Sequence, residues 1–236
     1  MRLPAPFQPH GEHIGIDLPG GGALFTTRRG GVSQGPFATL NLGLWTDDHP
    51  DRVRANRRRV AELVGARLAQ GRQVHGAWVN RVLDAPQGEP DEADGQVTEL
   101  PGVAPMVLVA DCLPVALTAP GAVAMLHVGW RGLAAGIVEA GVEGLGAVPA
   151  AAAIGPGAGP CCYQVGEEVH AAFGDAGRSG GNLDLKGLAR RRLEAAGVTE
   201  VHDVGICTIC ADPALFFSHR RDRGVTGRQA GVVWRT

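Results

Sequence analysis

Apolar residues recur along this 236-residue chain with two different periods, and each period predicts a different kind of element. From Pro50 to Gln70 they return every three or four positions, which predicts an amphipathic helix with Asp48 as its start signal. The same spacing predicts a helix from Gly166 to Phe173, and another that follows Asp184 and stops at Gly197.

Short, continuous apolar runs predict buried strands between these helices. Strands that are apolar on both faces and interleaved with helices indicate an α/β fold, with layers on each side of the sheet. The runs between residues 106 and 128 follow one another too closely for helical crossovers, so we expect antiparallel pairing and hence a mixed sheet. The predicted strands are Met106–Ala110, Val115–Leu117, Val123–Val128, Val201–Ile206 and Gly231–Trp234.

The apolar stretches do not predict a membrane protein. The longest, from Val103 to Val128, is broken by Asp111 and Pro114, whereas a membrane helix needs about 20 unbroken apolar residues. Pro4 and Pro6 stand where a secretory signal would need an apolar run. We therefore expect a cytoplasmic protein.

Composition narrows the class further. A chain that is 44% hydrophobic and 19% charged is neither disordered nor fibrous, and a net charge of -2 gives no electrostatic reason to bind nucleic acid or an anionic membrane. An odd number of cysteines, five, without a signal segment indicates reduced thiols that are free to bind metal or do chemistry. Irregular loops are expected over Ala85–Gly95, which is acidic, and over the Gly- and Pro-rich residues 155–160.

Reactive side chains lie where the predicted strands end. Asp111 and Cys112 follow one strand, His127 closes another, and His75 precedes a glycine. Two imidazoles and a thiolate suit zinc and leave a fourth tetrahedral position open. Their spacing matches no local zinc motif, however, so the spacing alone favours a buried thiol and two hydrogen-bonded histidines over a metal site.

Two other groups of residues have alternative interpretations. Cys207-Thr208-Ile209-Cys210 could be half of a zinc knuckle or a redox pair, but no second such pair follows, and packing is the favoured role. Arg28, ahead of two glycines, and Arg131, after a glycine and Trp130, suit a phosphate or carboxylate, with a surface ion pair as the alternative. Residues Arg57, Arg58 and Arg59 are expected on the solvated face of their helix.

Seven segments in order resemble one family, the YfiH-like proteins, which are also named laccase-domain proteins or polyphenol oxidases and are now regarded as purine nucleoside phosphorylases. The segments are FTTRRGGVSQGPFATLNLGL from Phe25, QVHG from Gln73, ADG from Ala93, ADCLPVAL from Ala110, LHVGWRGLAAGI from Leu126, GPGAGPCCYQVGEEV from Gly155, and the closing FFSHRRD with TGR. The resemblance spans nearly the whole chain and implies a single catalytic domain over residues 1–236.

The resemblance implies a layered α/β/α fold related to toxin cysteine hydrolases, and a zinc ion held by His75, Cys112 and His127. It also implies phosphorolysis of adenosine, inosine, guanosine and methylthioadenosine, together with adenosine deamination, which makes the protein a transferase and a hydrolase. Purine nucleosides and phosphate are the expected partners, and a monomer or weak homodimer is the expected state.

The candidate site residues follow from these motifs. Arg28, Asn41 and Arg131 are candidates for substrate binding, with Arg28 the first choice for phosphate. Asp111 has two equally weighted roles, proton shuttle or a partner that orients a histidine ligand. The chain departs from the family pattern with His219 in place of Tyr and Gln164 in place of Glu, and no role is assigned to either.

Three alternatives to a phosphorylase remain open. A His/His/Cys set also binds copper, as the older family name implies, but eight histidines without an H-x-H pair do not support a multicopper relay. A cysteine hydrolase would use Cys112 as nucleophile and His127 as base. A module that binds metal or a partner without catalysis would turn over no nucleoside.

Overall fold

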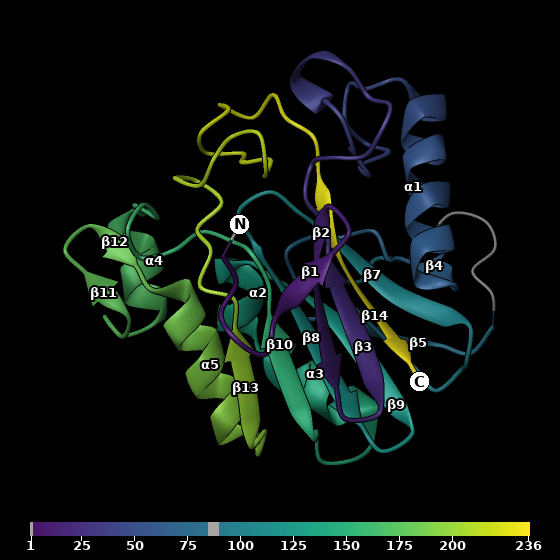
Figure 1. Cartoon of the computed structure of the whole chain (residues 1–236). Coiled ribbons are helices and arrows are strands. Elements are labelled where there is room, and N and C mark those ends of the chain that lie inside the picture. Colours follow the sequence, from purple (N-terminus) through teal and green to yellow (C-terminus); the bar gives the residue numbers. More distant parts are fainter. Residues whose placement is uncertain (1, 85–89) are drawn as a thin grey trace.

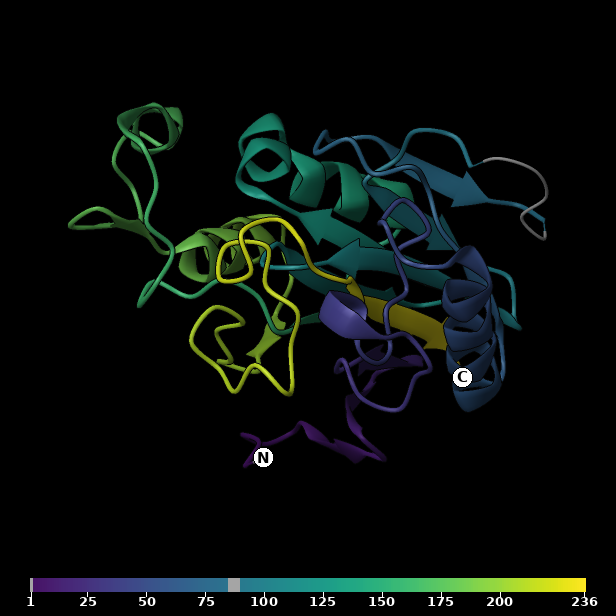
Figure 2. The same ribbon diagram turned by 90° about the horizontal axis from the view of Figure 1, so that it is seen from above.

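A computed structural model describes residues 2–84 and 90–236. Two six-stranded sheets pack face to face, and helices cover their outer sides (Figures 1 and 2). The predicted mixed α/β fold with flanking helices is confirmed. The expected acidic loop at Ala85–Gly95 is only partly covered, because residues 85–89 lie outside the described residues.

The first sheet combines strands from both ends of the chain in the order β1-β2-β3-β14-β7-β4. The C-terminal strand β14 (Gln229–Arg235) lies between β3 (Gly21–Phe25) and β7 (Val103–Val109), antiparallel to both. The other members are β1 (Gln8–His10), β2 (His13–Leu18) and β4 (Arg67–Ala69).

The second sheet has the order β13-β10-β8-β9-β6-β5. Its centre is the hairpin of β8 (Leu113–Ala119) and β9 (Ala122–Val128), which pair antiparallel as predicted. The prediction is wrong for β7, which joins the other sheet, because the turn at residues 110–112 carries the chain from one sheet to the next. The other strands are β5 (Val79–Val82), β6 (Gly95–Thr98), β10 (Ala151–Ile154) and β13 (Glu200–Asp203), with a separate ribbon of β11 (Arg178–Ser179) and β12 (Asn182–Leu183).

The layer between the sheets is tightly filled. Val107 and Val233 from the first sheet pack with Ala116 and Met125 from the second. At Gly231 a Cβ atom would lie 2.5 Å from the Cβ of Pro114 and 2.9 Å from the Met125 sulfur. Glycine is therefore required where β14 crosses the β8–β9 hairpin, since any side chain would push the sheets apart.

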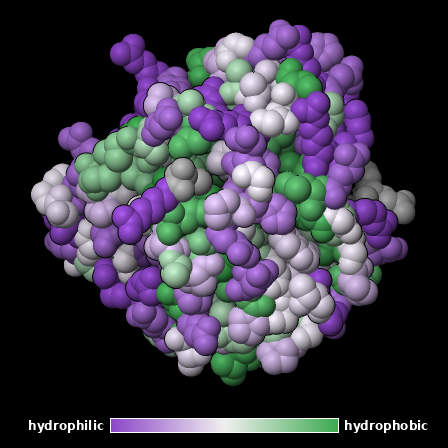
Figure 3. Space-filling view, in the orientation of Figure 1, coloured by the Kyte–Doolittle hydropathy of each residue, from purple (hydrophilic) through white to green (hydrophobic). Residues whose placement is uncertain are grey.

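Helices close the two outer faces. Helix α1 (Pro50–Val64) packs over the first sheet, where Val60 joins a cluster with Met106 and Val232. The other four cover the second sheet: α2 (Trp130–Ala135), α3 (Ile137–Leu145), α4 (Glu167–Ala172) and α5 (Leu185–Ala195). No described helix combines the length and the apolar character that crossing a bilayer requires. Hydrophilic and hydrophobic residues are interspersed over the face that Figure 3 shows.

The predicted helices at Gly166–Phe173 and after Asp184 are confirmed as α4 and α5. The predicted helix over Pro50–Gln70 is too long at its C-terminal end, because Gly65 adopts a left-handed φ of 64° and the chain continues as β4. Its start signal is His49, whose side chain accepts a hydrogen bond from the Asp51 N–H, rather than Asp48. Helices α2 and α3 were not predicted from the sequence.

Helix α1 is tied to the loop before it through one amide side chain. Asn56 is fully buried; its Oδ1 accepts from the Val32 N–H at 2.9 Å. Its Nδ2 donates to the Ser33 hydroxyl and to the Thr39 and Asn41 carbonyls. One side chain thus hydrogen-bonds to four polar groups of the loop, two of them in a buried setting.

Replacing Asn56 with Ala is expected to lower the free energy of unfolding by about 3 kcal/mol, because the partners lose their hydrogen bonds in a buried setting. Urea denaturation of wild type and variant measures the change. The control is Arg58→Ala, an exposed position on the same helix, for which a change within about 0.5 kcal/mol is expected. Equal effects of the two substitutions would contradict the role of Asn56.

Candidate metal centre and active site

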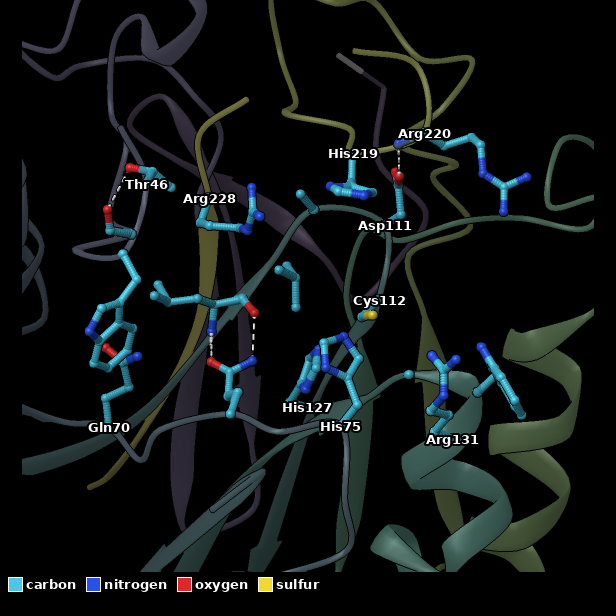
Figure 4. Close-up of a pocket in the computed structure, with 18 of the residues that line it drawn as sticks. Thr46, Gln70, His75, Asp111, Cys112, His127, Arg131, His219, Arg220 and Arg228 are labelled. Carbon is cyan, nitrogen blue, oxygen red and sulfur yellow. Dashed lines mark hydrogen bonds between the residues drawn. The ribbon is translucent and has the colours of Figure 1, made fainter. Parts of the chain in front are cut away.

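A pocket of about 520 Å³ opens at the end of the sheets where β7 stops, β8 starts and β9 stops (Figure 4). Its walls come from segments far apart in sequence, from Gly43 to Arg228. His75, Cys112 and His127 all line it, as do Asp111 and Arg131. Five of the seven residues singled out from the sequence therefore meet in one place.

The three candidate metal ligands converge. One ligand atom each from His75, Cys112 and His127 lies within 4.8 Å of the other two. The two imidazole rings meet edge to face, with centroids 4.9 Å apart and planes at 78°.

Strand register explains why Cys112 and His127 meet. In the β8–β9 hairpin Pro114 is opposite His127. Cys112 stands two residues before Pro114, so its side chain lies on the same face as His127 and diagonally next to it. A Cβ atom on Gly129 would lie 3.1 Å from the Cys112 sulfur and 3.3 Å from the His75 ring. The glycine after the strand therefore leaves room for both ligands.

A carboxylate that the sequence reasoning left unassigned orders the whole centre. Asp94 is fully buried just before β6, and its Oδ1 lies 2.7 Å from His127 Nδ1. Register again explains the meeting, because Gly95 pairs with Leu126 and the His127 N–H donates to the Asp94 carbonyl at 2.7 Å. With Nδ1 engaged by Asp94, the other ring nitrogen of His127 is left for a metal.

The same carboxylate shapes the loop that carries His75. The backbone N–H groups of Val74, His75 and Gly76 donate to Asp94 at 2.8–3.0 Å. These three bonds hold His75 at a left-handed φ of 62°, a conformation that is costly for a residue with a Cβ. Upstream, the Gln73 amide pairs with both backbone groups of Leu108 at 2.8 Å, so the loop is fixed at its other end.

The electrostatics of the centre favour the charged forms of both Cys112 and His127. Burial alone would lower the pKa of His127, but the Cys112 sulfur and Asp94 outweigh it and raise that pKa. Burial alone would raise the pKa of Cys112, but the two imidazoles outweigh it and lower that pKa. A thiolate at Cys112 is the form that binds metal and the form that acts as a nucleophile.

The arrangement fits a tetrahedral metal with one open position. Two imidazoles and a thiolate form a three-ligand set, one ligand is oriented by a buried carboxylate, and the remaining side faces the pocket. Zinc and copper both accept such ligands.

Asp111 lines the pocket but does not orient a ligand. Its Oδ1 accepts from the Thr208 hydroxyl and its Oδ2 from the Arg220 N–H, both at 2.7 Å. The carboxylate thus ties the C-terminal segment to the strand turn, where its own φ is 94°. The orienting role considered for Asp111 belongs to Asp94, in the ADG motif.

Arg28 and Asn41 lie outside the pocket wall. The Arg28 guanidinium donates to the carbonyls of Ala38, Pro213 and Pro36 and stacks 4.3 Å from the centre of the Phe217 ring. Asn41 is fully buried; its Oδ1 accepts from the Arg228 N–H at 2.8 Å, and so it positions a residue that does line the pocket.

Three arginines line the pocket: Arg131, Arg220 and Arg228. Arg131 stacks on Trp130, Arg220 donates to the Gln164 carbonyl, and Arg228 donates to the Thr226 and Gly227 carbonyls. Within residues 2–84 and 90–236 none of the three has a carboxylate ion-pair partner, and their charge is available to an anion. Sequence alone pointed to Arg131 only.

Gln70 supplies an unused hydrogen-bond donor. Its Oε1 accepts from Arg57 at 2.6 Å, which fixes the amide, and its Nε2 is buried without a partner among the described residues while the side chain lines the pocket. The expectation that Arg57 lies on a solvated helix face is wrong, because Arg57 also donates to the Leu42 carbonyl at 2.8 Å. An unpaired buried donor in a pocket points to a ligand acceptor.

Residues 22–236 match the protein family described as multi-copper polyphenol oxidoreductase laccase. The chain belongs to this family. The resemblance to YfiH-like proteins is thereby confirmed: the chain is similar to YlmD of Geobacillus stearothermophilus, with 37% identity, a TM-score of 0.88 and 97% of each chain covered. The YfiH structure from Bacillus licheniformis gives 30% identity and a TM-score of 0.89, with 99% and 100% of the two chains covered.

Relatives of the family carry a different functional name. A purine nucleoside phosphorylase of Pseudomonas aeruginosa is 43% identical over 229 residues, covering 90% of this chain and 92% of its own. One from Deinococcus radiodurans is 42% identical over 227 residues, covering 89% and 87%.

Substituting Asp94 with Asn is expected to weaken the binding of a metal by the candidate centre roughly 10- to 100-fold, because partners of this kind tune ligand affinity to that extent. An amide also cannot accept at both ends, so either His127 or the backbone N–H groups lose their acceptor. Competition with a chromophoric chelator measures the affinity. The matched control is Asp91→Asn, an exposed acid three residues away, which should leave it unchanged; unaltered affinity in Asp94→Asn would contradict the role.

Proposed function

We propose that this protein is a zinc-dependent purine nucleoside phosphorylase, which converts a nucleoside and phosphate into a purine base and ribose 1-phosphate. The observation that carries the proposal is the pocket itself, in which the His75–Cys112–His127 set opens onto arginines that have no carboxylate partner in the described part of the chain. The functional names of the relatives agree with it.

The pocket divides into two sides. In Figure 4 the metal ligands lie between Gln70 on one side and Arg131 and Arg220 on the other. Guanidinium groups bind phosphate through paired N–H donors, and Arg131 and Arg220 are therefore assigned to phosphate in place of Arg28. Arg228 lies between the two sides and suits either phosphate or ribose oxygens.

The purine is assigned to the side with Gln70. The free Nε2 of this residue donates to a ring nitrogen or carbonyl of the base. Trp45, which lines the same pocket and is 61% exposed, offers an aromatic face on which a base stacks.

The reaction requires that the protein position the phosphate, supply a proton to the leaving base and provide a Lewis acid. A phosphate oxygen attacks the anomeric carbon while the bond to the base nitrogen breaks; the bonding pair leaves with the purine, which then takes up a proton. Arg131 and Arg220 hold the phosphate in line, and His219 at the pocket wall is assigned as the proton source. A zinc ion on the three ligands would supply a Lewis acid beside the reacting groups.

The substrate range follows as part of the proposal. Adenosine, inosine, guanosine and methylthioadenosine share the purine face and the ribose that this pocket would bind. Adenosine deamination is a second activity of the same site, with Asp111 as the pocket carboxylate that would handle protons. Chromatography of the products separates the two, since phosphorolysis of adenosine gives adenine and deamination gives inosine.

Purified protein is expected to release hypoxanthine from inosine only when phosphate is present. His75→Ala should lower kcat/KM by more than about 100-fold together with loss of the metal, because a ligand of the reacting centre is removed. His202→Ala, a histidine on β13 outside the pocket, is the control and should keep full activity. Phosphate-independent release, or full activity in metal-free His75→Ala, would sink the proposal.

Gln70→Leu is expected to raise KM for the nucleoside about 10-fold with little change in kcat, since it removes one hydrogen bond to the base. Initial rates at saturating phosphate measure the split. Gln8→Leu, an exposed amide on β1, is the control. A rise confined to the KM for phosphate would show that Gln70 contacts phosphate and would contradict its assignment to the purine.

A second candidate is a cysteine hydrolase. The Cys112 thiolate lies beside the His127 imidazole, and the Asp94 carboxylate contacts the other side of that ring. This is the arrangement of a nucleophilic triad. That function predicts inactivation by an alkylating reagent and indifference both to chelators and to His75→Ala. A copper polyphenol oxidase has less support, because the described residues bring together no histidine-rich cluster beyond this trio.

A further inference from the structure

Four cysteines outside the pocket converge at one point on the surface. Cys161 and Cys162 lie in the loop after β10, and Cys207 and Cys210 lie in the segment after β13. Their sulfur atoms are all within 4.8 Å of one another. The sequence favoured packing for the Cys207–Cys210 pair, but Cys161 and Cys210 are exposed and so contribute little to a core.

We propose that these four cysteines form a second metal site, a tetrathiolate centre that binds one zinc ion independently of the pocket. Four thiolates with no other ligand are the donor set of closed structural zinc sites. The sequence holds only one C-x-x-C pair, and the adjacent Cys161 and Cys162 supply the other two ligands from a distant loop.

The sulfur spacing agrees with a metal at the centre. Zinc–sulfur bonds of about 2.3 Å in a tetrahedron place neighbouring sulfurs about 3.8 Å apart. The Cys161 and Cys210 sulfurs are 3.6 Å apart, whereas a disulfide would need about 2.05 Å.

A backbone N–H group faces the Cys207 sulfur. The Gly159 N–H donates to the Cys207 Sγ at 3.2 Å. A Cβ on Gly159 would lie 3.1 Å from Cys207 Cβ and 3.4 Å from the Cys161 sulfur. Glycine therefore lets the two loops approach closely enough to share one ion.

The proposed ion would join one segment that lines the pocket to another that supports its wall. Tyr163 follows one cysteine pair and lines the pocket. Thr208, inside the other pair, donates to Asp111 and accepts from Arg221 at its carbonyl. A metal at the cysteines would thus fasten the turn on which Asp111 and Arg220 depend.

Metal content tests the proposal. Tag-free protein, purified without chelators or nickel resin, is expected to hold about two zinc ions per chain by elemental analysis. Cys112→Ser should lose the ion of the pocket site and retain the ion of the tetrathiolate site. Cys161→Ser/Cys210→Ser should lose the ion of the tetrathiolate site and retain the ion of the pocket. Both altered cysteines in the double variant are exposed, so it is expected to fold.

Cobalt substitution identifies the ligands of each remaining ion. Cobalt in Cys112→Ser should show thiolate-to-metal absorption several times stronger than cobalt in the double variant, because four thiolates rather than one bind it. A double variant that keeps wild-type zinc would overturn the proposal, and so would a single ion lost entirely in Cys112→Ser. Thiol titration showing a Cys161–Cys210 disulfide in fresh protein would overturn it too.

These outcomes are separable from the proposed function. If the protein holds two ions but releases no purine, the second site stands and the phosphorylase does not. If the protein releases purine but holds only one ion, the phosphorylase stands and the second metal site does not. Iron in the tetrathiolate position would support the site and overturn zinc as its ion.

Discussion

The buried carboxylate of Asp94 is the interaction on which the centre of this molecule depends. It accepts hydrogen bonds from three successive backbone N–H groups of the His75 loop and contacts the His127 ring. A buried charge is tolerated only when it is paired and hydrogen-bonded, and here the partners are the parts of the centre itself. The hydrogen bonds that position His75 and His127 are therefore the same bonds that compensate the buried charge of Asp94. A substitution that alters one effect also alters the other.

Sequence reasoning singled out two of the three candidate metal ligands because they stand at the ends of regular elements. Cys112 and His127 adjoin apolar runs whose hairpin pairing was predicted, and strand register then forces them together. His75 adjoins no predicted strand and was singled out by the glycine that follows it. Helices α4 and α5 were predictable for a similar reason, since apolar spacing in both and the Asp184 cap of α5 are local signals.

What could not be predicted depends on contacts between distant segments. Arg28 and Asn41 have the chemistry of substrate-binding groups, but the fold turns one toward backbone carbonyls and buries the other beneath Arg228. The division into two sheets rests on a three-residue turn that looks like any other strand connection. The two cysteine pairs lie about 45 residues apart, and the adjacent Cys161 and Cys162 do not have the C-x-x-C spacing that would have matched them to Cys207 and Cys210.

The place of β14 in the first sheet bears on how the chain can fold during synthesis. This last strand separates β3 from β7, so the sheet has no continuous centre until residues 229–235 have left the ribosome. The second sheet is built from residues 79–203 and can form earlier. The face of the second sheet that packs against the first would then be exposed to solvent until the first sheet is complete. During that period chaperone binding to the exposed apolar surface competes with misassembly.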